Sequence, residues 1–145
     1  MGKEIKMKIL FICKYNVFRS RVAEEYFKKI NRNKSIEVIS RGLIMGAESD
    51  NVQRGVAKKL LGVDINKRRA VPVTQKELIE SDLIIVVAND IPRVIFNYHK
   101  GILQKKVVIW GVKDEQRRNK RNIKRIVLSI KRKVDDLNKQ LEKRK

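Results

Sequence analysis

The sequence predicts an α/β fold, a single domain over residues 1–145 with a parallel, doubly wound sheet. Strand-like and helix-like patterns alternate about four times along the chain, and this alternation is typical of parallel sheets covered by helices. Three short runs are almost continuously apolar, as expected of strands that are buried on both faces. A length of 145 residues with 42% hydrophobic content is enough for one core.

The first half of the chain contains two predicted strands and two predicted helices. Residues 7–12 (MKILFI) predict a buried strand, and residues 20–33 have the apolar spacing of an amphipathic helix. Residues 35–39 (SIEVI) alternate like a short strand. Asp50 and Gln53 form a capping-box pattern that begins a second helix, and a glycine ends it.

The second half repeats this alternation. Thr74 and Glu77 form another capping-box pattern before a short helix. Residues 82–88 (DLIIVVA) and 106–112 (KVVIWGV) predict two more buried strands. Between these strands, residues 91–98 predict a helix with a proline in its first turn.

A long basic helix is predicted near the C-terminus, over about residues 117–143. Its apolar side chains form one stripe, and its other faces are mostly Lys and Arg. This pattern is typical of a structural helix that packs on the domain and exposes a solvated basic face. The stripe consists of Ile123, Ile126, Val127, Ile130, Val134, Leu137 and Leu141.

The chain carries a net charge of +20, which attracts phosphate-bearing partners of any kind. Residues 113–145 contribute +9 and the rest +11, so the charge is spread along the chain. Aromatic residues make up only 6%, and stacking platforms for single strands are therefore not evident. Nucleic acid is allowed as a partner by the charge but is not favoured.

Other chemistry and locations are excluded by what the sequence lacks. One cysteine, Cys13, cannot form an internal disulfide or a cysteine-rich zinc site. One histidine, His99 in a predicted surface loop, rules out a multi-histidine metal site. We therefore expect no metal and no cofactor. No stretch is apolar enough to span a bilayer and the N-terminus lacks a signal peptide, so we expect a cytoplasmic protein without membrane contact.

The segment ILFICKYNVFRSRVAEEYF, residues 9–27, places Cys13 where the first strand turns into the first helix. Sites in α/β folds lie at such carboxyl ends of strands, and residues 88–90 and 113–115 follow later strands at the same edge. A tight loop after Cys13 would point successive backbone N–H groups inward, where they can hold a tetrahedral dianion. The N-terminus of the helix adds further positive potential.

Each part of this loop suits phosphoryl transfer through a cysteinyl-phosphate. Arg19 would grip two phosphate oxygens, and the positive field would favour the thiolate of Cys13. The phosphate-binding residues would be Lys14, Tyr15, Asn16, Val17, Phe18, Arg19 and Ser20. A buried structural cysteine at a strand end is nevertheless common, and C-x5-R recurs by chance. From the residues alone, both interpretations of Cys13 remain open.

This segment resembles the active-site entry of low-molecular-weight protein tyrosine phosphatases, whose motif is C-x-G-N-x-x-R-S after a hydrophobic strand. The likeness continues through residues 40–42 (SRG), 61–64 (LGVD) and 73–74 (VT), and ends at residues 108–114 (VIWGVKD). It therefore covers most of the chain in the family's order. The resemblance implies a three-layer domain with a four-stranded parallel sheet, and a phosphate-binding loop between strand 1 and helix 1.

The resemblance also implies residue roles. Cys13 would be the nucleophile and Arg19 the phosphate clamp. Asp114, which by pattern could equally be a loop or cap residue, would protonate the leaving oxygen and then activate water. Other polar side chains would hold the loop's shape, assist the thiolate and brace the loop from behind. These supporting residues would be Asn16, Ser20 and Ser40.

The chain departs from the family's pattern at several positions. Tyr15 stands at the family's loop glycine, so either its backbone conformation suits a larger residue or the loop is altered; it could also form a wall of an aromatic slot. Lys67 or Arg68 falls where many members have a supporting histidine. Glu115 replaces the proline after the general acid, and polar residues at 116–118 replace aromatic ones.

Phe18 stands where many members have a second loop cysteine that protects the nucleophile in a disulfide. We therefore expect Cys13 to be open to irreversible over-oxidation. Related arsenate reductases pass electrons through further cysteines, and with Cys13 alone that cascade cannot run within this chain.

Two functions of different classes follow. The first is a phosphomonoester hydrolase of the protein-tyrosine-phosphatase type, which acts on a phosphorylated protein or small phosphomonoester and releases inorganic phosphate. The alternative is a catalytically weak module that binds phosphoprotein or nucleic acid. The intact nucleophile, clamp and acid favour the enzyme, since a pure binder needs no nucleophile. Tyr15 and the polar residues at 116–118 favour the module.

Overall fold

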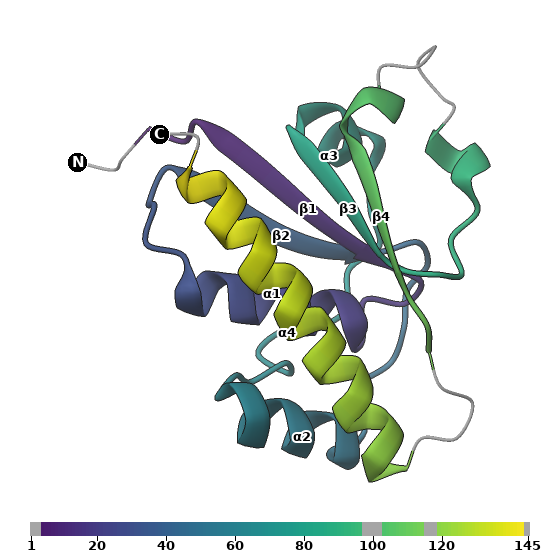
Figure 1. The fold of residues 1–145 in the computed structure, drawn as a ribbon. Coiled ribbons are helices and arrows are strands. Elements are labelled where there is room, and N and C mark those ends of the chain that lie inside the picture. Colours follow the sequence, from purple (N-terminus) through teal and green to yellow (C-terminus); the bar gives the residue numbers. More distant parts are fainter. Residues whose placement is uncertain (1–3, 97–102, 115–118, 144–145) are drawn as a thin grey trace.

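The computed structural model describes residues 4–96, 103–114 and 119–143 of the chain. Within them, four strands form one parallel sheet in the order β2-β1-β3-β4, which confirms the predicted α/β fold (Figure 1). The strands are β1 (Met7–Cys13), β2 (Ile36–Gly42), β3 (Leu83–Ala88) and β4 (Val107–Val112). β1 and β3 lie in the centre and are almost wholly buried, as their continuous apolar runs predict. The prediction that β4 is equally buried is wrong, because β4 lies at the edge of the sheet and exposes Val108 and Ile109.

Helices cover both faces of this sheet. On one face lie α1 (Arg19–Ile30) and α4 (Lys120–Glu142), with α2 (Asn51–Leu61) packed against α4 (Figure 1). The opposite face is covered by α3 (Gln75–Glu80) and by short 3-10 turns. Each face has its own apolar core, and the predicted stripe of α4 is buried in the larger one. The fold therefore has three layers, with the sheet between two layers of helices.

The helix boundaries follow their caps. Both predicted capping boxes are present, with the side chains of Asp50 and Thr74 accepting from the backbone N–H three residues on. Gly62 ends α2 in the left-handed conformation, with φ of 69°. Asn119 caps α4. The predicted start of α4 at residues 117–118 lies outside the described residues.

The prediction of a helix over residues 91–98 is wrong in its described part. Only a 3-10 turn, Arg93–Phe96, forms there. Pro92 pushes the residue before it out of the helical region, so an α-helix cannot begin earlier in this segment. Residues 97–98, and His99 with its predicted loop, lie outside the described residues.

Two glycines provide a matched test of the backbone in α2. Gly55 lies inside the helix with open space around an added Cβ, so Gly55→Ala should raise the free energy of unfolding by about 0.5–1 kcal/mol. Gly62→Ala should lower it by about 1 kcal/mol, because φ of 69° strains an L-residue. Urea unfolding of both variants measures the difference, and changes of the same sign would contradict this explanation.

A bulge near the carboxyl end of β4 shapes the region of the site. Val86 pairs with Ile109 whereas Ala88 pairs with Val112, so β4 carries one extra residue there. Gly111 lies within this irregular stretch and has φ of 63°. The bulge changes the direction of the chain just before Lys113 and Asp114.

Candidate active site

The loop between β1 and α1 surrounds Cys13, which ends β1 and is buried. The backbone N–H groups of residues 14–18 donate no hydrogen bond to any described residue. α1 begins directly after them with no side-chain cap and no acidic residue in its first turn. Buried N–H groups without partners are costly, and a helix N-terminus favours negative charge. These features suit a bound anion beside the sulfur, and phosphate binding by residues 14–20 stays a prediction.

The conformation of Asn16 explains how Tyr15 fits at the family's glycine position. Among the described non-glycine residues, only Asn16 has positive φ, at 56°, and Asn tolerates the left-handed region better than most residues. Tyr15 therefore needs no glycine-like backbone. Gly46 lies opposite Tyr15, and a Cβ on Gly46 would lie 2.6 Å from the Cβ of Tyr15. Because Gly46 has no side chain, Tyr15 has the space it needs at this position.

A chain of side-chain hydrogen bonds extends inward from the sulfur. Cys13 Sγ lies 2.9 Å from Ser20 Oγ. Asn16 Nδ2 donates to Ser20 Oγ at 2.9 Å and to Ser40 Oγ at the same distance. Asn16, Ser20 and Ser40 are wholly buried. The structure thus brings together the three supporting residues that the resemblance implied.

Arg68 and Glu24 set the direction of this chain. Arg68 can only donate, and its Nη1 bonds to Asn16 Oδ1 at 3.2 Å, so the amide nitrogen of Asn16 must face the two serines. The Glu24 carboxylate can only accept, and Ser40 donates its hydroxyl hydrogen to it. Ser20 accepts from Asn16, and its own hydrogen is therefore free to point at Cys13 Sγ. A donor aimed at sulfur stabilises a thiolate.

Of the two basic residues that the resemblance left open, Arg68 joins this network and Lys67 does not. Arg68 Nη2 also donates to Ser40 Oγ and to Glu24 Oε1, at 2.9 and 2.8 Å. Lys67 instead lies 3.6 Å from Glu25 and is exposed. Sequence reasoning left the two basic residues undecided, because only the path of the loop shows which one reaches Asn16.

Glu24 is ionised in this buried network. Burial alone would raise the pKa of Glu24, but hydrogen bonds from Lys28 and Ser40 and the charge of Arg68 outweigh it and hold the pKa below the ordinary 4.5. A lowered pKa stabilises the fold at pH above the unfolded value, and this contribution is lost as pH falls through the folded value.

Glu24→Gln should therefore lower the free energy of unfolding by about 2 kcal/mol at neutral pH, since it leaves a partly buried Arg68 without its counter-charge. The gap to wild type should narrow as pH falls below 4.5, because the unfolded chain then takes up a proton at Glu24 that the folded protein binds only at lower pH. Denaturant unfolding as a function of pH measures this. The exposed Glu37→Gln is the control and should show no such gap; a gap for Glu24→Gln that stays constant with pH would contradict the explanation.

Arg19 is positioned by two other strand ends. Its Nη1 donates to the carbonyl oxygen of Val112 at 2.8 Å, at the end of β4. Its Nη2 lies 3.2 Å from the carboxylate of Asp90, which follows β3. Asp90 was placed by sequence at this edge but given no role. An ion pair between the ends of adjacent strands is a tertiary contact, and no local sequence motif predicts it.

Asp114 lies two residues beyond Val112 and is exposed. Because Val112 contacts Arg19, Asp114 follows a strand end that is tied to the catalytic loop. Its carboxylate makes no hydrogen bond or ion pair with a described residue, unlike that of Asp90. Asp114 is thus available to exchange protons with a substrate, and its role as general acid remains a prediction. Residues 115–118 lie outside the described residues.

Within the described part of the chain, no three His, Cys, Asp or Glu side chains come together as metal ligands. No described helix is long and apolar enough to cross a membrane.

A family model described as low molecular weight phosphotyrosine protein phosphatase matches residues 8–145. The chain belongs to this family. It is accordingly a cysteine-dependent phosphomonoester hydrolase by family, and Cys13 is the one cysteine it has. No curated protein matches the chain.

Solved structures of low identity share the fold over nearly the whole chain. A low molecular weight phosphotyrosine phosphatase from Vibrio cholerae has a TM-score of 0.83 at 20% identity, covering 95% of this chain and 98% of its own. The YwlE arginine phosphatase from Geobacillus stearothermophilus has 0.80 at 15%, covering 95% and 94%. An arsenate reductase in a phosphate-binding state has 0.75 at 20%, covering 92% and 98%. At these identities the similarity is one of fold.

Proposed function

We propose that this member of the phosphatase family hydrolyses aryl phosphate monoesters, above all phosphotyrosine in proteins, through a cysteinyl-phosphate on Cys13. The observation that carries this proposal is the Ser20 hydroxyl 2.9 Å from Cys13 Sγ, oriented by Asn16, inside a loop of unpartnered N–H groups. A site that only binds phosphate has no need of a hydrogen bond that stabilises a thiolate.

In the first step the Cys13 thiolate attacks phosphorus, an S–P bond forms and the bond from phosphorus to the leaving oxygen breaks. Asp114 donates its proton to that oxygen. Arg19 and the N–H groups of residues 14–18 hold the three non-bridging oxygens, over which the negative charge of the transition state is spread. In the second step Asp114 takes a proton from water as the water attacks phosphorus. Inorganic phosphate leaves, and the thiolate is regenerated with Ser20 stabilising it.

The rim of the site suits an aromatic leaving group. Tyr15, Ile44 and Met45 expose 42%, 47% and 71% of their surface, and all lie in or beside the catalytic loop. Lys14 Nζ lies 5.3 Å from the centre of the Tyr15 ring. An apolar, aromatic rim stabilises a phenyl ring above the phosphate site. The net charge of +20 disfavours a cationic leaving group such as the guanidine of phosphoarginine.

A reducing compartment such as the cytoplasm suits this proposed chemistry. Cys13 must remain a thiol, and no second cysteine is present to protect it as a disulfide.

The test compares three substrates with EDTA and a reducing agent present: p-nitrophenyl phosphate, a phosphotyrosine peptide and a phosphoarginine peptide. We expect hydrolysis of the first two without metal, and a phosphoryl group on Cys13 in acid-quenched protein by mass spectrometry. Preference for phosphoarginine would overturn the substrate class. Phosphopeptide binding without turnover in folded protein would support the phosphate-binding module instead.

A further inference from the structure

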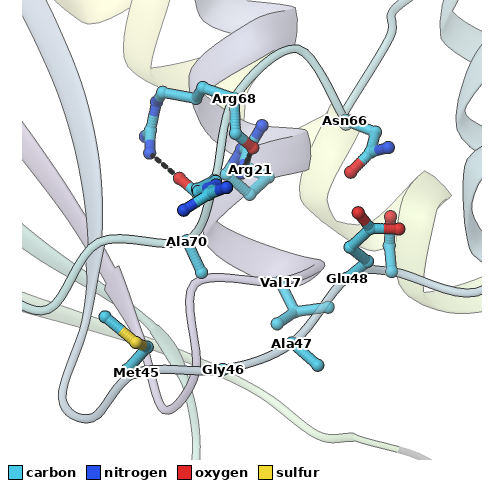
Figure 2. A pocket seen from close by; sticks show the side chains of 11 residues that line it. Val17, Arg21, Met45, Gly46, Ala47, Glu48, Asn66, Arg68 and Ala70 are labelled. Carbon is cyan, nitrogen blue, oxygen red and sulfur yellow. Dashed lines mark hydrogen bonds between the residues drawn. The ribbon is translucent and has the colours of Figure 1, made fainter.

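A pocket of about 430 Å³ lies beside the catalytic loop (Figure 2). Neither Cys13 nor Arg19 lines it. Its wall is formed by Val17 of the loop, Arg21 in the first turn of α1, and the segments 45–49 and 66–70. Figure 2 shows Arg21, Asn66 and Glu48 around it. The pocket therefore adjoins the catalytic loop and shares Val17, Met45 and Arg68 with the loop and its surroundings, but it contains neither the proposed nucleophile nor the phosphate clamp.

Arg21 is a buried cation that forms no direct ion pair with a described residue, although the carboxylates of Glu24, Glu25 and Asp64 lie near enough to act on its charge. The residue is only 3% exposed, and it makes no ion pair with any described residue. Its Nη1 donates to the carbonyl oxygen of Arg68 at 2.9 Å, but its Nε has no hydrogen-bond partner. Arg68 cannot neutralise the charge of Arg21, because it is itself a cation beside Arg21. The ion pair of Arg68 is with Glu24. A guanidinium stays charged, so this burial is unfavourable while the pocket is empty.

A second buried polar group in the same wall also lacks a partner. Ser49 is 3% exposed, and its Oγ makes no hydrogen bond. Asn66 and Arg69 line the pocket as well, and their side chains donate no hydrogen bond to a described residue. Glu48 is the acidic residue of the described wall and is exposed. Buried polar groups normally find partners, so two orphans in one wall point to a missing ligand.

We propose that this pocket binds an oxyanion, a phosphate or carboxylate group, at a site distinct from the catalytic loop. Arg21 supplies the charge, and Ser49 and Asn66 supply neutral donors. The Nε of Arg21 and the Oγ of Ser49 are covered in the empty pocket, so the anion reaches them after a small turn of these side chains. The group belongs either to a free ion or to the substrate, next to its scissile phosphate.

In the first experiment the whole chain is titrated with inorganic phosphate, and ¹H–¹⁵N NMR measures the changes in chemical shift. We expect phosphate to shift the Nε–H resonance of Arg21 and the amides of residues 46–49 and 66–70, besides those of the catalytic loop. Arg19→Met should weaken the loop response and leave the pocket response. Arg21→Met should abolish the pocket response, whereas Arg32→Met, which removes an exposed charge elsewhere, should not.

Arg21→Met should fold, because replacing an unpaired buried charge with an apolar side chain of similar length is often neutral or stabilising. If Arg19→Met does not fold, the titration of the wild type still tests the proposal, since the resonances of the pocket and those of the catalytic loop are distinct. A pocket that does not respond in wild type, or responds equally in Arg21→Met, overturns the proposal. This titration needs no turnover and so stands apart from the test of the proposed function.

The second experiment identifies the source of the anion. Phosphotyrosine peptides of equal length, with acidic or neutral residues beside the phosphotyrosine, are compared by KM. A lower KM for the acidic peptide that disappears in Arg21→Met assigns the pocket to the substrate's own carboxylates. A phosphate response without such a preference assigns it to a free anion. If the pocket shows neither a phosphate response nor this preference for the acidic peptide, the proposal is overturned.

Discussion

Cys13→Ser should lower kcat for p-nitrophenyl phosphate by about 10⁴-fold or more, the loss expected when a nucleophile is removed. A serine hydroxyl is far less acidic than a thiol, so neither Ser20 nor the loop N–H groups can keep it ionised at neutral pH. The substitution changes little in shape at this buried position, and the hydrogen bond to Ser20 can persist. Steady-state kinetics measures the loss.

The matched control for this substitution is phosphate binding. The N–H groups of residues 14–18 and Arg19 are untouched in Cys13→Ser, so inorganic phosphate should still bind the loop with affinity within a few-fold of wild type. Hydrolysis within about tenfold of wild type, with the protein shown to be folded, would exclude Cys13 as the nucleophile.

Asp114→Asn should slow the reaction by about 10²–10⁴-fold for substrates with a poor leaving group, the range typical of a lost general acid. Phenyl phosphate needs a proton on its leaving oxygen, whereas p-nitrophenolate is a much weaker base and leaves more easily without one. The loss should therefore be clearly larger for phenyl phosphate. kcat for both substrates, in wild type and variant, tests this.

Asp90→Asn is the matched control, since it changes a carboxylate of the same edge that contacts Arg19 instead of facing solvent unpaired. Loss of the ion pair loosens the phosphate clamp, so both substrates should suffer alike. If Asp90→Asn shows the dependence on the leaving group and Asp114→Asn does not, Asp90 is the general acid and the assignment from sequence is wrong.

Most secondary-structure elements could be predicted from sequence because their signals are local. The apolar runs of β1, β3 and β4 and the capping boxes at Asp50 and Thr74 depend on residues a few positions apart. The catalytic loop is local for the same reason, since Cys13, Arg19 and Ser20 lie within eight consecutive residues. The prediction for the segment 91–98 was wrong, because its apolar spacing allows a helix whereas its described part forms only the 3-10 turn Arg93–Phe96.

The partners of the loop could not be predicted, because they come from distant parts of the chain. Arg68 lies 52 positions from Asn16, and Asp90 lies 71 positions from Arg19. The chain contains 36 Lys and Arg, so from the sequence Arg68 is expected to be one more solvated charge. The same applies to Arg21, because nothing in its local sequence indicates that it lies inside the protein.

Local patterns and composition were enough to predict the class of fold, the loop around Cys13 and the charge that attracts phosphate, since each depends on neighbouring residues or on residue counts. Which charges are buried, and which groups they contact, became visible only in the folded chain: Arg68 bonds to Asn16, Asp90 pairs with Arg19, and the Nε of Arg21 has no hydrogen-bond partner. The energy of a charge depends on its burial and on its neighbours in space, and neither is a property of the local sequence.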